Sequence, residues 1–210
     1  GMAYDVYLPA GYADDEETRY RTIYVFAPPG GRQMGQFDKA MDNIFSAGTV
    51  APAILVFPQF PPTPDGQRAF IEELVPEIDK QYRTVADRQG RSTAGFGFAA
   101  GAAIGLATRH NDQFSGCAVY SPLVFDAEQA MIAAAFENLE NPMSYYIDWG
   151  RFDMNNPHEN WDIRDISTQL YELCRDTQGV TVRGGMVNDS MDWSSWRNRY
   201  LEFLKIGAEE

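Results

Sequence analysis

Short strand-like runs alternate with helical patterns along the whole chain, and this alternation limits the fold more than any other feature. Seven runs rich in β-branched, aromatic or small apolar residues predict strands: Tyr4–Leu8, Thr22–Ala27, Ala53–Phe57, Ser92–Gly95, Gly116–Tyr120, Ser144–Asp148 and Gly179–Arg183. The predicted helices are Gln67–Tyr82, Ala99–Arg109, Ala127–Glu137, Ile163–Arg175 and Ser194–Lys205. Because parallel strands need long crossover connections, this order predicts an α/β fold in which helices flank a mostly parallel central sheet. We expect one domain over residues 1–210.

The composition is that of a chain with a true hydrophobic core, since 44% of residues are hydrophobic and 13% aromatic. No apolar run approaches the roughly 20 residues that a membrane helix needs. No secretory signal pattern opens the sequence, and Gly1 before Met2 is typical of a residue left after removal of a purification tag. The net charge of −13 repels phosphate backbones and anionic lipids, so we expect neither nucleic acid nor membranes as partners.

Few residues suit a metal or cofactor site. Cys117 falls in a strand pattern and Cys174 in a helix pattern, which predicts two buried free thiols. The chain has two histidines and no zinc-binding spacing, and the run 188–192 offers oxygen atoms without the EF-hand pattern. We therefore expect no metal and no cofactor.

Several blocks of sequence, in order along the chain, resemble one enzyme family. The resemblance rests on Tyr4–Pro9, Phe70–Asp79, Tyr82–Thr84, Gly90–Phe96, Gly150–Asp153 and Asp192–Arg197. These blocks are similar to the Putative esterase family, which includes feruloyl and acetylxylan esterases of carbohydrate esterase family one, enterochelin esterases and esterase D. The resemblance implies an α/β-hydrolase fold and a serine, histidine and acid triad.

The triad positions that the resemblance implies depart from that pattern. The family's Gly-x-Ser-x-Gly elbow reads Gly95-Phe96-Gly97-Phe98-Ala99 here, which puts Gly97 at the nucleophile position. Met191 stands at the histidine position, and Asp153 matches the acid. A glycine has no group that attacks a carbonyl and a thioether accepts no proton at useful pH, so the resemblance predicts a degenerate site.

The oxyanion hole implied by the family is altered as well. The amide of Phe98, directly after the nucleophile position, remains as a donor. The second donor falls in Pro28-Pro29-Gly30-Gly31, where Pro29 has no backbone N–H. Changes at three parts of one site favour natural loss of esterase chemistry over a single engineered knockout.

A displaced catalytic centre is the alternative within the same fold. Four serines, Ser92, Ser121, Ser190 and Ser194, are candidate nucleophiles, but each also fits an ordinary place in a strand, loop or helix start. His110 matches a structural segment after the elbow helix, and His158 lies five residues beyond Asp153. Neither histidine stands where the family's base is expected.

Three tryptophans are candidate ligand-binding residues. Trp149 follows a predicted strand, Trp161 follows the Asp153 loop, and Trp193 adjoins the histidine position. Together they would suit a sugar or a phenolic group at the mouth of the site. For each, packing inside the fold is an equally good interpretation.

Three functions stay open on the sequence. The first is a catalytically inactive pseudo-esterase that binds plant-polysaccharide or phenolic-ester ligands in its vestigial cleft. The second is an active carbohydrate, feruloyl or acetyl esterase with an unconventional catalytic group. The third is a structural or protein-interaction module whose cleft is closed by Met191, Phe96 and Phe98. The family resemblance also implies secretion and attachment to glycoside hydrolase modules in a larger chain.

Overall fold

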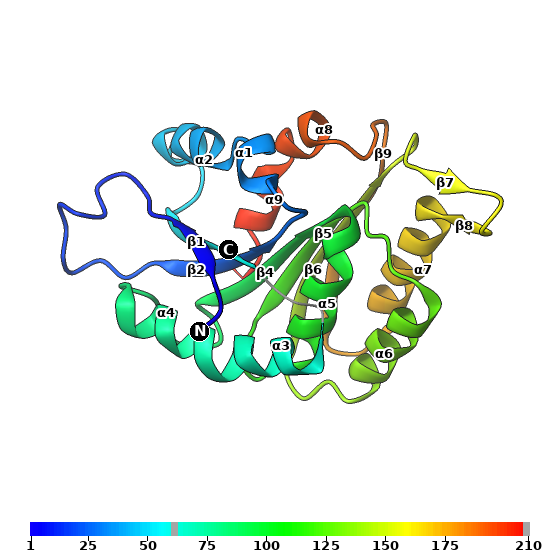
Figure 1. The fold of residues 1–210 in the computed structure, drawn as a ribbon, viewed down its shortest axis with the longest axis horizontal. Coiled ribbons are helices and arrows are strands. Elements are labelled where there is room, and N and C mark those ends of the chain that lie inside the picture. Colours follow the sequence, from blue (N-terminus) through cyan, green and yellow to red (C-terminus); the bar gives the residue numbers. More distant parts are fainter. Residues whose placement is uncertain (60–62, 208–210) are drawn as a thin grey trace.

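The main sheet is mostly parallel and carries helices on both faces (Figure 1). The computed structural model describes residues 1–59 and 63–207. The sheet order is β1-β3-β2-β4-β5-β6-β9, with β1 antiparallel to β3 and every other pair parallel. The strand bounds are β1 (Tyr4–Tyr7), β2 (Arg21–Phe26), β3 (Ala53–Pro58), β4 (Arg91–Phe96), β5 (Gly116–Tyr120), β6 (Met143–Gly150) and β9 (Val180–Val187). The predicted α/β fold is confirmed.

The helices connect the strands as crossovers and form two layers (Figure 1). One face carries α1 (Gly31–Met34), α2 (Phe37–Ser46), α8 (Trp193–Arg197) and α9 (Tyr200–Leu204). The other carries α3 (Pro64–Ala69), α4 (Val75–Gln81), α5 (Ala100–Arg109), α6 (Asp126–Glu137) and α7 (Ile163–Asp176). A π-helical turn at Phe70–Leu74 joins α3 to α4, and a 3-10 turn at Gly97–Ala99 precedes α5. A small hairpin of β7 (Asn155–Asn156) and β8 (Trp161–Asp162) follows β6.

The seven predicted strands all form, and their ends move where pairing extends them. The prediction of β9 stopped at Arg183, but the strand continues to Val187 because it pairs with β6 as far as Gly150. The sequence patterns did not predict α1, α2 or the β7–β8 hairpin. These elements are short or amphipathic, and α2 buries little beyond Phe37 and Met41.

The predicted helix Ser194–Lys205 is wrong as a single element, because it is broken at Asn198–Arg199. Arg199 leaves helical geometry, with φ −118° and ψ 11°, and its guanidinium reaches the buried Asp148. The apolar stripe expected along this segment is nonetheless buried as predicted, in the side chains of Trp196, Tyr200, Phe203 and Leu204. Cys117 and Cys174 are buried free cysteines, also as predicted.

Two apolar clusters, one on each face of the sheet, form the core. The cluster under α2, α8 and α9 is dense in aromatic rings, and Phe96 lies among them at the end of β4. The Phe96 ring stacks on Tyr120 at a centroid distance of 4.7 Å and also contacts Trp196 and Tyr200. No helix in residues 1–59 and 63–207 has both the length and the apolar character needed to cross a bilayer.

The two phenylalanines that flank Gly97 should differ sharply in their effect on stability. Phe96 is fully buried, so we expect Phe96→Ala to lower the free energy of unfolding by about 3–5 kcal/mol through a lost core ring. Phe98 is 61% exposed, so Phe98→Ala should stay within about 0.5 kcal/mol of the parent. Urea unfolding followed by circular dichroism measures both values. Equal losses in the two variants would contradict the assignment of Phe96 to the core.

Candidate functional site

The candidate site begins at the turn between β4 and α5, at the carboxyl edge of the parallel sheet. Gly97 occupies this turn in the left-handed region, with φ +57°. A Cβ on Gly95 would lie 2.6 Å from Ala100 Cα and 2.7 Å from Ala103 Cβ, so only glycine lets α5 approach β4 this closely. The carbonyl of Gly97 accepts a hydrogen bond from the Leu123 N–H at 3.3 Å. The local geometry is a sharp strand-to-helix elbow centred on Gly97.

The side chain of Met191 fills the space above this elbow. Met191 lies in the segment between β9 and α8. A Cβ built on Gly97 would be 2.6 Å from Met191 Cε and 3.3 Å from Trp196 Cη2. The two positions that the sequence assigned to the nucleophile and the histidine therefore face each other, and the thioether methyl occupies the room that a side chain at position 97 would need.

Asp153 lies in the loop after β6 and is buried, with 4% of its surface exposed. Its Oδ2 accepts a hydrogen bond from the Gly150 N–H at 2.8 Å. Its Oδ1 is buried and has no hydrogen-bond partner among the described residues. Burial raises the pKa of the Asp153 carboxyl above its usual range. Asp153 is thus a buried, hydrogen-bonded loop aspartate, with one carboxylate oxygen bonded to the backbone of its own loop.

The Asp153 loop and the Met191 segment are joined directly. The Phe152 N–H donates to the Asp189 carbonyl at 3.0 Å. A Cβ on Gly150 would lie 2.3 Å from that same carbonyl oxygen and 2.5 Å from Asp153 Oδ1. The loops after β4, β6 and β9 therefore bring Gly97, Met191 and Asp153 to the same end of the sheet.

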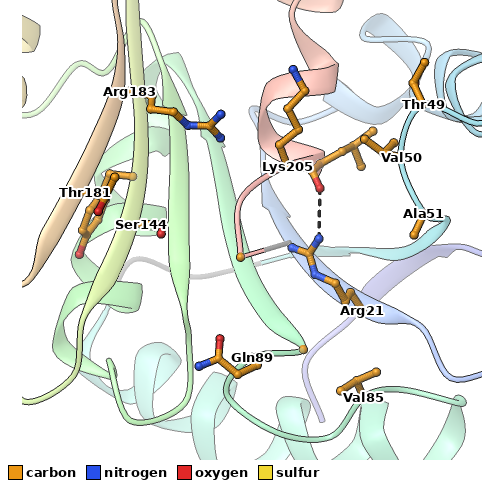
Figure 2. Close-up of a pocket in the computed structure, with 14 residues that line it drawn as sticks. Arg21, Thr49, Val50, Ala51, Val85, Gln89, Ser144, Thr181, Arg183 and Lys205 are labelled. Carbon is orange, nitrogen blue, oxygen red and sulfur yellow. Dashed lines mark hydrogen bonds between the residues drawn. The ribbon is translucent and has the colours of Figure 1, made fainter. Parts of the chain in front are cut away.

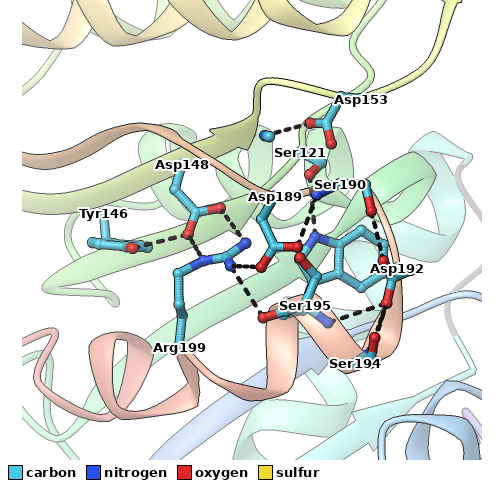
Figure 3. Close-up of polar contacts among 12 residues, drawn as sticks. Ser121, Tyr146, Asp148, Asp153, Asp189, Ser190, Asp192, Ser194, Ser195 and Arg199 are labelled. Atoms are coloured by element: carbon cyan, nitrogen blue, oxygen red, sulfur yellow. Dashed lines mark hydrogen bonds and ion pairs between the residues drawn. The ribbon is translucent and has the colours of Figure 1, made fainter.

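A buried ion pair fixes the Met191 segment to the sheet (Figure 3). Arg199 Nε lies 2.5 Å from Asp148 Oδ2, which also accepts from the Tyr146 hydroxyl at 2.8 Å. The same guanidinium pairs with Asp189 Oδ2 at 3.2 Å and donates to the Ser195 carbonyl at 3.0 Å. Burial raises the pKa of Asp148 to about 6, against the opposing charge of Arg199.

This pair was not predicted from the sequence. The only signal was a charged residue in each of two apolar patterns, Asp148 at the end of a predicted strand and Arg199 within the predicted helix Ser194–Lys205. Such a residue is equally typical of an exposed strand end or helix start. Only the crossing of the two elements shows that the charges meet.

Asp192 caps α8 and orders the residues around Met191 (Figure 3). Its carboxylate accepts from the Ser194 N–H at 2.8 Å, the Ser195 N–H at 3.1 Å and the Ser190 hydroxyl at 2.7 Å. The Ser194 hydroxyl also donates to it. The two serine hydroxyls and the backbone N–H groups lower the pKa of Asp192 to about 2.

Of the four candidate serines, only Ser121 interacts with a triad position in the described part of the chain: its hydroxyl lowers the pKa of Asp153, against the larger effect of burial, which raises it. Ser92 is buried in β4, and Ser121 is fully buried with its Oγ accepting from Trp196 Nε1 at 3.1 Å. Ser190 and Ser194 both donate to Asp192. No hydrogen bond joins any of them to His110 or His158 within residues 1–59 and 63–207, and His158 lies on the exposed loop before β8.

The three tryptophans do not form the expected cluster. Trp149 is buried at 7% exposure and packs against Tyr171 at 5.9 Å, so its assignment as a ligand-binding residue is wrong. Trp193 is half-buried and packs on Trp196 at 5.0 Å, while its expected role stays a prediction. Trp161 is half-buried and meets Phe125 edge to face at 6.4 Å. The expectation failed at Trp149 because its side chain lies on the face of the sheet that α7 covers, where it meets Tyr171.

A set of exposed apolar side chains lies in the loops at this edge, and sequence analysis did not single out most of them. They are Phe98, Phe125, Phe152 and Met154, with exposures of 61%, 52%, 67% and 51%. We call these four residues the apolar rim. In the sequence, these residues were indicated only by their position directly after a strand or beside a triad position. In the third alternative Met191, Phe96 and Phe98 close the cleft; of these Met191 covers Gly97, while Phe96 lies in the core and Phe98 faces solvent.

The loop after β2 borders the site with a separate hollow. Pro28, Pro29 and Gly30 line a cavity of about 500 Å³ together with residues of β3 and α1. The Gly31 N–H is already engaged by the Pro28 carbonyl at 2.8 Å. Trp193 closes over this loop, since a Cβ on Gly31 would lie 3.0 Å from its Cζ2. The described part of the chain contains no group of three or more histidine, cysteine or acidic side chains that could hold a metal ion.

Comparison with known proteins identifies the family. The pattern of the family described as Putative esterase matches residues 57–193, more than half of the chain. The chain belongs to this esterase family. Its predicted membership and α/β-hydrolase-like fold are both confirmed.

Solved structures of esterases share the fold at low sequence identity. A ferulic acid esterase superposes with a TM-score of 0.79 at 21% identity, covering 97% of this chain and 90% of that one. A mutant feruloyl esterase module from Clostridium thermocellum, complexed with sinapinate, gives 0.77 at 16%, covering 97% and 82%. An S-formylglutathione hydrolase from Agrobacterium tumefaciens gives 0.68 at 15%, covering 97% and 88%. An esterase-like module is therefore the functional class that the fold supports.

Gly97→Ala tests the elbow of this esterase-family chain. We expect a loss of about 1–2 kcal/mol in the free energy of unfolding, because the new Cβ meets both a positive φ and the Met191 methyl. The double variant Gly97→Ala with Met191→Ala should remove the clash with the Met191 methyl. The remaining loss in the free energy of unfolding, about 1 kcal/mol, then comes from the positive φ at position 97.

Gly105→Ala in the middle of α5 is the matched control for this substitution. Its Cβ would meet only ordinary contacts, the nearest being Arg109 Nη1 at 3.5 Å, so we expect a gain of about 0.5–1 kcal/mol. Urea unfolding measures these three variants and the parent. A Gly97→Ala variant as stable as the parent would contradict the elbow geometry.

The contribution of the Asp192 N-cap of α8 to the free energy of unfolding should depend on pH. The pKa of Asp192 is lowered from 3.8 to about 2, so its stabilisation is present above pH 4 and is lost as the pH falls towards 2. Asp192→Ala should cost about 1 kcal/mol at pH 7, with solvent screening limiting the charge contribution. Asp192→Asn keeps a capping oxygen and should remove the pH dependence of this term. Thermal melts at pH 2, 4 and 7 compare the three chains, and an unchanged pH slope in Asp192→Asn would refute the assignment.

Proposed function

We propose that this chain is a non-hydrolytic esterase-like module that binds a phenolic-ester or plant-polysaccharide ligand at the carboxyl edge of its sheet. The contact between Gly97 and Met191 carries the first half of the proposal. Serine-esterase chemistry needs a nucleophile at the elbow and a base that takes its proton. Here the elbow has no side chain, and a thioether methyl occupies the space above it.

The state of Asp153 supports the same reading. In a working triad the acid orients and stabilises an imidazole. Asp153 instead has a buried Oδ1 with no hydrogen-bond partner among the described residues. A buried acceptor without a donor is costly, so a site built for catalysis would be expected to fill it. Burial also raises the pKa of this carboxyl, while the Gly150 N–H, the Ser121 hydroxyl and the charge of Arg199 lower it in part.

The apolar rim supports the ligand half of the proposal. A hydrogen bond from the Leu123 N–H to the Gly97 carbonyl joins the loops that carry Phe98 and Phe125. Phe125 also contacts Trp161. Aromatic side chains beside polar groups suit both sugar rings and phenolic rings. Since Met191 fills the deep part of the site, we expect a shallow contact with a dissociation constant of about 0.1–1 mM.

Catalytic inactivity is tested by hydrolysis of aryl acetates and methyl ferulate. We expect no turnover above background from the natural sequence. The double variant Gly97→Ser with Met191→His restores a nucleophile and a base and removes the methyl that would clash, so we expect measurable hydrolysis. Gly97→Ala with Met191→His is the matched control and should stay inactive. Saturable turnover by the natural sequence that persists through purification would refute the proposal.

Ligand binding is tested by NMR titration with xylo-oligosaccharides, with and without feruloyl groups. We expect chemical-shift changes at Phe98, Phe125 and Trp161, and a loss of affinity of about fivefold or more in Phe125→Ala. Met34→Ala, which changes an exposed apolar residue on α1, should bind as the parent does. If millimolar ligand shifts no resonance near the rim, the ligand half of the proposal falls, and protein interaction through the exposed rim takes its place.

A further inference from the structure

A hollow lies at the opposite end of the sheet from the esterase elbow. It has a volume of about 840 Å³ and opens beside the amino ends of β2, β4, β6 and β9 (Figure 2). Volumes in this range are typical of small-molecule sites. Its polar lining combines hydroxyls, an amide and cations, contributed by Arg21, Thr49, Gln89, Ser144, Thr181, Arg183 and Lys205.

The charge of this cavity is opposite to that of the protein. The chain carries 30 acidic residues against 17 basic ones, yet among residues 1–59 and 63–207 three basic and no acidic residues line this space. A smaller cavity of about 270 Å³ adjoins it, shares Gln89, Ser144 and Thr181 with it, and adds Arg88, again with no acidic lining residue in the described part of the chain. A concave site lined by one sign of charge concentrates the field and attracts ions of the other sign.

Arg21 gives the cavity a fixed positive charge. Its Nη1 donates to the Leu204 carbonyl at 3.1 Å, and its Nη2 donates to the Ile206 carbonyl. Its Nε is buried without a hydrogen-bond partner among the described residues, and it has no ion pair there. Burial lowers the pKa of Arg21, as expected for a cation without a nearby carboxylate.

Arg183 faces the same space from β9 and is exposed (Figure 2). No ion pair or hydrogen bond of its side chain is formed within residues 1–59 and 63–207. Lys205 contributes less, because its Nζ is paired with Glu202 at 2.9 Å. The two arginines are therefore the main unneutralised charges of the cavity, and arginine matches phosphate and carboxylate oxygens through paired N–H donors.

We propose that this amino-edge cavity binds a small multivalent oxyanion, a metabolite-sized molecule bearing phosphate or carboxylate groups. Arg21 and Arg183 neutralise its charge, and the Ser144 and Thr181 hydroxyls and the Gln89 amide supply neutral donors. The site is independent of the esterase elbow, since the two lie at opposite edges of the sheet. Neither function requires the other.

Isothermal titration calorimetry with pyrophosphate and with citrate tests the proposal and separates phosphate from carboxylate ligands. We expect saturable binding of at least one probe, weakened as NaCl is raised from 20 to 200 mM. Arg183→Gln should reduce the affinity about tenfold, because it removes one cation from the cavity. Arg175→Gln removes an exposed arginine of α7 that pairs with Asp176, and should leave the affinity unchanged.

Three outcomes would overturn the proposal. The first is the absence of saturable binding of either probe at 10 mM. The second is an equal loss of affinity in Arg183→Gln and Arg175→Gln, and the third is an unchanged affinity in Arg183→Gln. Arg183 is exposed, so its variant should fold, and circular dichroism melts check this. Arg21→Gln is a second variant, expected to lose binding if it keeps the parent's spectrum. Ferulate binding at the apolar rim, measured on the same variants, should not change, so failure at one site leaves the other proposal standing.

Discussion

The close approach of α5 to the end of β4 is the contact on which the candidate site depends. Gly95 permits it, because any Cβ there would overlap Ala100 and Ala103. The chain then has to reverse within a few residues, and Gly97 takes the positive φ that this reversal requires. Phe96 points down into an aromatic cluster while Phe98 points out to solvent. One tight helix–strand contact thus sets which residue is core, which is elbow and which is surface.

An ion pair and a helix N-cap, in place of a catalytic hydrogen-bond chain, hold the rest of the site to this elbow. The buried ion pair of Arg199 and Asp148 ties the segment after β9 to β6. Asp192, in the same segment, is the N-cap residue of α8. A buried ion pair of this kind contributes little net stability but penalises other arrangements, because either charge left alone would be costly. The thioether of Met191 is positioned by these contacts and packs over Gly97, where its methyl occupies the space of a side chain at position 97.

The two edges of the sheet differ in character. The carboxyl edge carries the elbow, the half-satisfied Asp153 and the apolar rim, so its character is apolar with one buried acid. The amino edge carries Arg21 and Arg183 in a cavity that no acidic residue of the described ranges lines. Since a parallel sheet collects all its strand starts at one edge and all its strand ends at the other, residues far apart in sequence are sorted by their place on a strand. This sorting gives one small domain two chemically distinct surfaces.

The sequence alone determined the fold and the family, and the tertiary structure decided what the residues at the expected triad positions contact. The alternation of strand and helix patterns predicts seven strands, and all seven form, because each pattern reflects local burial. The motif around Gly97 indicates the elbow, since the glycines act through local backbone geometry. The burial of Trp149, the break at Arg199 and the charge of the amino-edge cavity were not predictable. Each depends on which strands become neighbours, and no local pattern records that.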